Sequence, residues 1–355
     1  MFEKKNKKNS LPGSNLTSLA DLGEFGLIDR LTGDIRIHHP ETIKGVGDDA
    51  AVIDTGEKLI LLSTDLLVEG VHFDMTYTPL RHLGYKAAVV NISDIAAMNG
   101  IPKQMTCSIA VSSRFSAEAL DEIYAGIKLA CEKYRIDLVG GDTSSSLKGL
   151  MISVSILGES LKDEVVYRNG AKPGDLVCVT GDLGAAYIGL LILEREKKVF
   201  EVNPGMQPEL TGFDYLIGRQ LKPEARTDVR DLLRGLGIKP TSMIDISDGL
   251  ASEILHLCRQ SGTGCKLFEE KIPIDDLTRQ IAMEFKIIPS VAALSGGEDY
   301  ELLFTISQTD YERIKAVDGI SVIGHMTIPE EGKLMITPDG QEVPLTAQGW
   351  DGFSK

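Results

Sequence analysis

A thirty-residue stretch from Gly45 to Asp74 constrains this chain more than any other part of its sequence. Two alternating apolar runs, residues 50–53 and 59–62, flank the turn-forming segment 54–57, which reads Asp-Thr-Gly-Glu. Alternation with a period of two on either side of such a turn predicts a β-hairpin. The fold is therefore expected to build its first sheet around this hairpin.

Acidic and hydroxyl side chains mark one end of the predicted hairpin. Asp48 and Asp49 precede the first strand, and Ser63, Thr64 and Asp65 follow the second. An antiparallel pairing would bring these five oxygen-bearing side chains close together, where they repel one another unless a cation is present. Hard oxygen ligands without Cys or His favour Mg²⁺ or Mn²⁺ over zinc. The alternative interpretation is a polar loop beside a strand edge.

Length and charge limit the classes of protein that this chain can be. At 355 residues it is long for a single domain, and two domains are expected. The net charge of −15 argues against binding the phosphate backbone of a nucleic acid. A small phosphate ligand is compatible with that charge if metal ions bridge it to carboxylates.

The cysteines and the apolar segments predict a cytoplasmic protein. The five cysteines are odd in number and form no C-x-x-C pair, which favours reduced thiols. Residues 1–20 begin with lysines but lack the apolar stretch of a secretory signal, so we expect a flexible tail. No apolar stretch is long enough to span a bilayer, and no membrane partner is expected.

The rest of the first half predicts an α/β sandwich. Helices are expected over residues 21–31, from Thr78-Pro79 to about Asn99-Gly100, and over 117–134, with strands over 104–111, 137–139 and 150–158. This order predicts strands on one sheet with helices on one side. Asp94 lies in the second, largely apolar helix, where an unpaired carboxylate is costly, so it is either a metal ligand or a cap for a neighbouring segment.

Three further segments repeat the combination of glycine and carboxylate beside a predicted strand. They are Gly140-Gly141-Asp142-Thr143, Asp245-Ile246-Ser247-Asp248-Gly249 and Ser295-Gly296-Gly297-Glu298-Asp299. Glycine lets the backbone approach a ligand closely, and the carboxylates suit a complex of phosphate and metal. Ordinary turns and helix N-caps use the same residues. Arg168 lies at the expected junction between the domains, where its guanidinium group either binds a polyphosphate or is solvated.

Several common nucleotide motifs are absent from the sequence. It contains no G-x-x-x-x-G-K-[ST] loop, no G-x-G-x-x-G after a strand and no kinase H-R-D or D-F-G set. If the protein handles nucleotide phosphates, it is expected to do so through metal ions held by carboxylates.

Taken in order, the motifs resemble those of the thiamine-monophosphate kinases. They are GVGDDAAV, LLSTDLLVEGVHF, KAAVVNISDIAAMNGIP, LVGGDTSSS, YRNGAKPGD, IDISDGL, LSGGEDYELLFT and a terminal GWDGF. The resemblance runs from about Gly23 to Phe353, and N-x-S-D-x-A-A-M-x-x-x-P and S-G-G-E-D-Y-E-L-x-F are its specific elements. The G-D-D, G-G-D-T and S-D-G elements are shared with a wider superfamily similar to aminoimidazole ribonucleotide synthetase.

The resemblance implies a set of site residues at the matching positions. The implied magnesium ligands are Asp49, Ser63, Thr64, Asp65, Asp94, Asp142, Asp245 and Asp248. The implied ATP contacts are Tyr124, Gly141, Asp142, Arg168 and Ser247, and the implied substrate contacts are His72, Glu298 and Trp350. The family's ending carries a His where this chain has Gly352.

The resemblance also implies a fold and a reaction. The expected fold is α/β (α+β) with two domains: residues 21–160 bind ATP and Mg²⁺ and pair across a homodimer as a barrel, and residues 161–355 complete the site. The implied reaction is the last step of thiamine diphosphate biosynthesis, in which ATP phosphorylates thiamine monophosphate. Several Mg²⁺ ions would assist direct in-line transfer, without a catalytic base or a phosphoenzyme.

Other functions fit the sequence less well. Among related enzymes, the selenide-using type carries a reactive Cys or selenocysteine near its N-terminus and the hydrogenase-maturation type ends in Cys, whereas this chain has no Cys before Cys107 and ends in Lys355. A purine-pathway cyclo-ligase is an alternative that the N-I-S-D-I-A-A-M and S-G-G-E-D-Y-E-L segments fit less well. A non-catalytic regulator that binds magnesium and nucleotide is the non-enzyme alternative.

Overall fold

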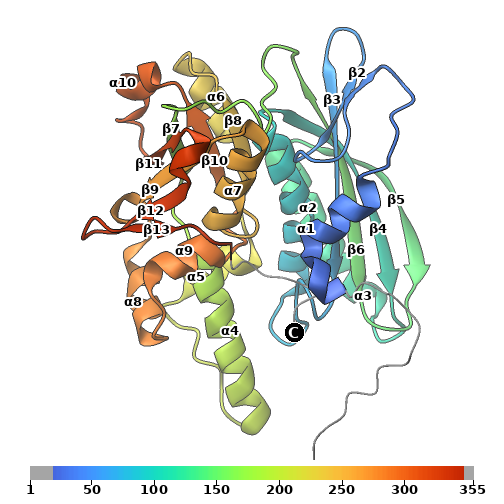
Figure 1. Cartoon of the computed structure of the whole chain (residues 1–355). Coiled ribbons are helices and arrows are strands. Elements are labelled where there is room, and N and C mark those ends of the chain that lie inside the picture. The colour runs from blue at the N-terminus through green and yellow to red at the C-terminus, as the bar shows by residue number, and fades with distance from the viewer. Residues whose placement is uncertain (1–18, 348–355) are drawn as a thin grey trace, which may run out of the picture. The chain divides into compact units, whose positions relative to one another are not determined.

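A computed structural model describes residues 19–347 of the chain, with side chains described from residue 26 onward. Its first helix, α1 (Leu19–Thr32), matches the helix predicted over residues 21–31 and belongs to a separate unit. A compact unit that begins at Ile37 contains two β-sheets (Figure 1). Trp350 and Gly352 lie outside the described residues.

The first sheet has six strands in the order β1-β2-β3-β6-β4-β5. Their bounds are β1 (Thr42–Lys44), β2 (Ala51–Asp54), β3 (Leu59–Val68), β6 (Met151–Ser160), β4 (Ile101–Val111) and β5 (Asp137–Ser145). β4 and β5 are parallel, and the other neighbours are antiparallel. The predicted hairpin is confirmed, because β2 pairs with β3 in the register Ala51 opposite Leu62.

Two helices, α2 (Leu80–Ala97) and α3 (Ala117–Tyr134), cover one face of this sheet. Along β3, Leu61 and Leu67 are buried toward the helices, whereas Leu62 and Leu66 on the other face are 39% and 51% exposed. This period-two pattern is that of a sheet with one covered face. The predicted arrangement of helices on one side is therefore confirmed.

The second sheet has seven strands in the order β13-β12-β9-β11-β7-β10-β8. Their bounds are β13 (Glu342–Pro344), β12 (Lys333–Ile336), β9 (Gly264–Phe268), β11 (Ile320–Thr327), β7 (Leu176–Thr180), β10 (Leu302–Ile306) and β8 (Ser242–Asp245). The α-helices of this half are α4 (Ala185–Val202), α5 (Asp214–Leu221), α6 (Asp228–Gly235), α7 (Leu250–Ser261), α8 (Asp276–Glu284), α9 (Pro289–Ser295) and α10 (Tyr311–Ile314). Short 3₁₀ turns are η1 (Glu269–Lys271), η2 (Gln308–Asp310) and η3 (Pro329–Glu331).

Several elements differ from the sequence prediction. β3 and β5 continue through the segments expected to follow them, 63–65 and 140–143. Their polar side chains therefore alternate between two faces instead of gathering at one strand end. The turn-forming sequences Asn203-Pro204-Gly205 and Gln207-Pro208 predict a surface insertion over residues 195–212. The first part of this segment is instead helical, because α4 continues to Val202. α5 was not predicted because it is only eight residues long, too short to show a clear apolar period.

Helix α2 connects the two sheets. It packs on β3 and β6 of the first sheet and also contacts β8 of the second (Figure 1). Fourteen of its residues are buried, which requires apolar contacts on nearly all sides. Polar side chains on this helix are consequently held between the sheets. Among the described residues, no helix has both the length and the apolar character needed to cross a lipid bilayer.

Candidate active site

Three carboxylates from distant parts of the chain converge between the two sheets. Asp49 lies just before β2, Asp94 lies on α2 and Asp245 is the last residue of β8. One oxygen atom from each can be chosen so that all lie within 4.8 Å of one another. Three carboxylate oxygens at that spacing suit the coordination of a hard divalent cation.

Hydroxyl and amide groups surround this cluster. The Ser63 hydroxyl donates to Asp94, and the Ser93 hydroxyl donates to Oδ2 of Asp245 over 2.5 Å. The backbone N–H of Asp65 donates to the side-chain oxygen of Asn91 over 3.1 Å. These contacts fix the carboxylates in place while leaving further oxygens of the cluster available to a ligand.

The electrostatics of the cluster favour a cation. Burial, and then repulsion from Asp65, Asp245 and Asp49, raises the pKa of Asp94 well above its ordinary value. The pKa of Asp245 is raised for the same two reasons, and burial raises that of Asp65. Burial and the neighbouring Asp49 raise the pKa of Asp48 to about 6. A divalent cation would relieve this repulsion and restore the ionised forms.

Arg168 supplies positive charge to the cluster from the segment between the sheets. Its Nε and Nη2 atoms donate to the two oxygens of Asp49 over 3.0 and 2.8 Å. Its backbone N–H donates to Oδ1 of Asp48 over 3.1 Å. The guanidinium is thus a counter-ion within reach of any phosphate that binds at the cluster.

Three predicted magnesium ligands lie outside the group of three converging carboxylates. The Thr64 hydroxyl lies on the opposite face of β3, where it donates to the carbonyl oxygen of Val154 over 3.0 Å. Asp142 is exposed on β5, three strands from β3, which corresponds to about 14 Å. Asp248 lies in the loop after β8, where its backbone N–H donates to Oε1 of Glu253 over 3.0 Å.

The predicted ATP contacts fall into two groups. Gly141 lies against β4, where a Cβ atom would come within 1.8 Å of the carbonyl oxygen of Cys107, so only glycine fits. Tyr124 shares a side-chain hydrogen bond with the same Cys107. Together with Asp142, these residues mark the β4–β5 edge of the first sheet, whereas Arg168 lies at the carboxylate cluster.

Ser247 belongs with the second of these groups. It lies two residues after Asp245, and its carbonyl oxygen accepts from the N–H of Glu298 over 2.7 Å. The loop after β8 is therefore tied directly to the loop before β10. Through this bond the carboxylate cluster and Glu298 belong to one connected site.

The two described substrate candidates, His72 and Glu298, lie near each other. Burial lowers the pKa of His72, the nearby Glu298 raises it and Lys86 lowers it. Nδ1 of His72 accepts from the N–H of Val68 over 3.0 Å, which fixes the ring's orientation. Trp350, the third candidate, lies outside the described residues.

Sequence reasoning missed two residues that hold Glu298. Nζ of Lys86 donates to Oε2 of Glu298 over 2.7 Å, and Nε2 of Gln220 donates to the same oxygen over 2.6 Å. A lysine inside the apolar α2 segment was an available signal, because a buried ammonium needs a partner. Gln220 gave no such signal, since α5 was itself unpredicted.

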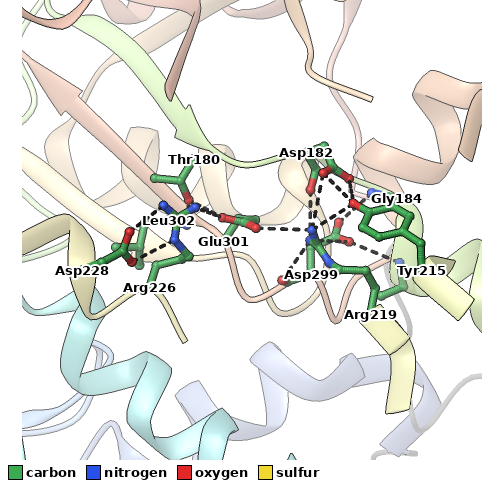
Figure 2. A network of polar contacts seen from close by, with 11 residues as sticks. Thr180, Asp182, Gly184, Tyr215, Arg219, Arg226, Asp228, Asp299, Glu301 and Leu302 are labelled. Carbon is green, nitrogen blue, oxygen red and sulfur yellow. Dashed lines mark hydrogen bonds and ion pairs between the residues drawn. The ribbon is translucent and has the colours of Figure 1, made fainter. Parts of the chain in front are cut away.

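A network of ion pairs lies around the residues that follow Glu298 (Figure 2). Arg219 of α5 lies 3.6 Å from a carboxylate oxygen of Asp299 and 3.4 Å from one of Glu301. Arg226 donates to Glu301 over 2.7 Å, and Asp299 accepts from the N–H of Gly184 over 2.8 Å. These contacts hold a loop that has unusual backbone angles, with φ of +60° at Glu298.

The fold and this site define a class of protein. Residues 47–160 match the family model described as the N-terminal domain of AIR synthase related protein. A solved structure described as hydrogenase maturation protein HypE in complex with ATP shares the fold, with a TM-score of 0.64 at 20% identity. The chain is thus an α/β protein of the AIR synthase related class.

More similar relatives identify the family. The thiamine-monophosphate kinase of Bacillus subtilis is 35% identical over 94% of this chain and 100% of its own length, and that of Aquifex aeolicus is 36% identical over 89% and 99%. A structure described as AaThiL complexed with AMPPCP and TMP matches with a TM-score of 0.81 at 34% identity, over 96% of this chain and 100% of that chain. The chain belongs to the thiamine-monophosphate kinase family.

Proposed function

We propose that this protein transfers the γ-phosphoryl group of ATP to thiamine monophosphate, giving thiamine diphosphate and ADP. The observation that carries the proposal is the convergence of Asp49, Asp94 and Asp245 in one connected site with Glu298 and His72. Two phosphate-bearing molecules repel each other, so a site that joins them needs concentrated positive charge among its ligands. A complex of a similar protein with AMPPCP and TMP supports these two substrates.

Magnesium is part of the proposal, and the residues present fit it. Asp49, Asp94 and Asp245 would hold the ion, with Ser63 and Asp65 beside them. When bound, Mg²⁺ neutralises phosphate charge and aligns the reacting oxygens. Arg168, which pairs with Asp49, would be released to contact phosphate as Asp49 turns to the ion.

The proposed transfer is direct. The acceptor oxygen belongs to a phosphate that is already anionic, so no side chain has to remove a proton from it. The chain's contribution is to bind both molecules, orient them in line and exclude water. Single-turnover work with labelled ATP should therefore yield labelled product without a phosphorylated protein.

A homodimer is proposed from the uncovered face of the first sheet. Leu62, Leu66 and Leu157 are each at least 39% exposed there, an apolar surface that a partner would bury. Among the described strands, β5 pairs only with β4, and the second half of β3 pairs only with β6. Two copies related by a two-fold axis would join β5 of one to β3 of the other and close a barrel.

We assign residues 21–160 to ATP and Mg²⁺ binding and to dimerisation, and residues 161–355 to completing the site. A cytoplasmic location agrees with five buried cysteines that all carry free thiols.

Incubation with ATP, MgCl₂ and thiamine monophosphate tests the function directly. Thiamine diphosphate, resolved by chromatography, is the expected product, and ADP should appear in equal amount. Substrates of the purine-pathway cyclo-ligases serve as the comparison. Turnover of those substrates without formation of thiamine diphosphate would overturn the proposal.

Magnesium should stabilise the protein more strongly as the pH rises. The folded-state pKa values of Asp48, Asp94 and Asp245 lie above their unfolded values, so without metal the fold is most stable below about pH 4 with respect to these groups. That stability is lost as the pH rises through the folded-state values, and a bound cation restores it. The Mg²⁺-induced shift in melting temperature, measured by calorimetry without nucleotide, should be larger at about pH 8 than at about pH 5.5. Equal shifts at both values would contradict the metal assignment.

A further inference from the structure

A buried lysine, Lys86, lies in the candidate active site without a place in the proposed phosphoryl transfer. It is 4% exposed and lies in the middle of α2. Its Nζ atom donates to Oε2 of Glu298 over 2.7 Å and to the carbonyl oxygen of Gln220 over 3.0 Å. A buried ammonium is costly unless it is paired, so the partners of Lys86 indicate what this side chain does.

The two carboxylate oxygens of Glu298 differ in their hydrogen bonds. Oε2 accepts from both Lys86 and Gln220, at 2.7 and 2.6 Å. Oε1 accepts no hydrogen bond from any residue in the described part of the chain, and the side chain is 27% exposed. One oxygen is therefore fixed by the protein while the other is left to contact a ligand. Burial lowers the pKa of His72, and this carboxylate lies near enough to His72 to raise it.

The backbone alone does not determine this direction. Glu298 follows Gly297, and the two residues have φ of +60° and +71°, in the left-handed region. Figure 2 shows that the anchors of the segment are downstream, where Arg219 and Arg226 pair with Asp299 and Glu301. The ion pairs hold the loop, whereas the clamp from Lys86 and Gln220 aims the Glu298 side chain.

We propose that Lys86 is a positioning residue for substrate recognition, which aims Oε1 of Glu298 at the cationic or amino-bearing ring of the phosphate acceptor. The proposal rests on the proposed function, because it assumes that Glu298 contacts thiamine monophosphate. Lys86 would then act on the phosphate acceptor and not at the carboxylate cluster, where ATP and metal are expected. Loss of the lysine should consequently affect one substrate and spare the other.

Steady-state kinetics of Lys86→Met test this separation. The KM for thiamine monophosphate should rise about 10- to 100-fold, the range expected when a charge-assisted hydrogen bond is lost, while the KM for ATP stays within about twofold. Lys86→Arg should recover much of the loss, because it keeps a cationic donor. The matched control is Lys58→Met, which removes another ion-paired lysine, 2.8 Å from Glu159 at the hairpin turn. The KM values of this control for thiamine monophosphate and for ATP should equal those of the wild type.

A double-mutant cycle distinguishes positioning from a merely structural role. If Lys86 acts through Glu298, then adding Lys86→Met to Glu298→Gln should raise the KM for thiamine monophosphate little further. Additive effects, or equal changes in both KM values, would overturn the proposal. If Lys86→Met does not fold, Gln220→Leu removes the other donor to the same oxygen and should give the same selective change, and an unchanged KM there would also overturn it. Absence of thiamine diphosphate formation by the wild type would instead overturn the proposed function, and this inference with it.

Discussion

Replacement of Asp94 by asparagine is expected to lower kcat by about 10³-fold or more while the chain still folds. Burial, and then repulsion from three other carboxylates, those of Asp65, Asp245 and Asp49, raises the pKa of Asp94. The Ser63 hydroxyl donates a hydrogen bond to Asp94. Asparagine has nearly the same shape but no charge. It therefore removes an anionic ligand from the proposed metal site without leaving a cavity.

Stability should respond to this substitution in the opposite direction to activity. Because Asp94 is repelled by its neighbours, the metal-free variant at about pH 8 should melt at the wild-type temperature or above it, and Mg²⁺ should raise that temperature less than in the wild type. Asp121→Asn, an exposed position on α3, is the matched control and should leave both quantities unchanged. Wild-type kcat in Asp94→Asn would show that the cluster does not hold the catalytic ion. A large fall in melting temperature would point to a structural role instead.

Local pattern predicted the first sheet well. The alternation around residues 54–57 predicted the hairpin, and the almost wholly apolar segment of α2 predicted a buried helix bearing Asp94. The same alternation, followed three residues further, would have separated Thr64 from Ser63 and Asp65, because successive side chains of a strand point to opposite faces. The expectation that all three gather at one end of the hairpin was therefore wrong for the Thr64 side chain.

Contacts between distant segments could not be predicted from local pattern. The neighbourhood of His72 and Glu298, 226 positions apart by their numbering, came from family resemblance and not from spacing. The clamp on Glu298 depends on α5, whose eight residues carry no clear period. Positive φ at Glu298 and Tyr300 is set by the surrounding ion pairs, since neither residue favours that conformation by itself. Tertiary contacts thus decide the details on which recognition depends.

The two groups of predicted ATP contacts lie far apart within one chain. Within one chain, Asp142 lies three strands from β3, about 14 Å away, and on an exposed edge strand. A single nucleotide cannot have its phosphates at the carboxylate cluster and at that edge of the same chain. If β5 of one subunit joins β3 of the other, Asp142 of the partner subunit lies on the strand next to the one that carries Ser63 and Asp65. Each site would then draw residues from two chains.

Shared sites should allow two inactive variants to restore each other. Asp142→Asn and Asp245→Asn should each be inactive alone, because each removes a proposed ligand from both sites of its dimer. Refolded together in equal amounts, half of the dimers pair one variant with the other, and each mixed dimer has one intact site. About a quarter of wild-type activity should return, as symmetry and random pairing require. Mixing two portions of the same variant is the control and should restore nothing. Failure to recover activity in mixtures shown to contain mixed dimers would place all ligands of a site within one chain.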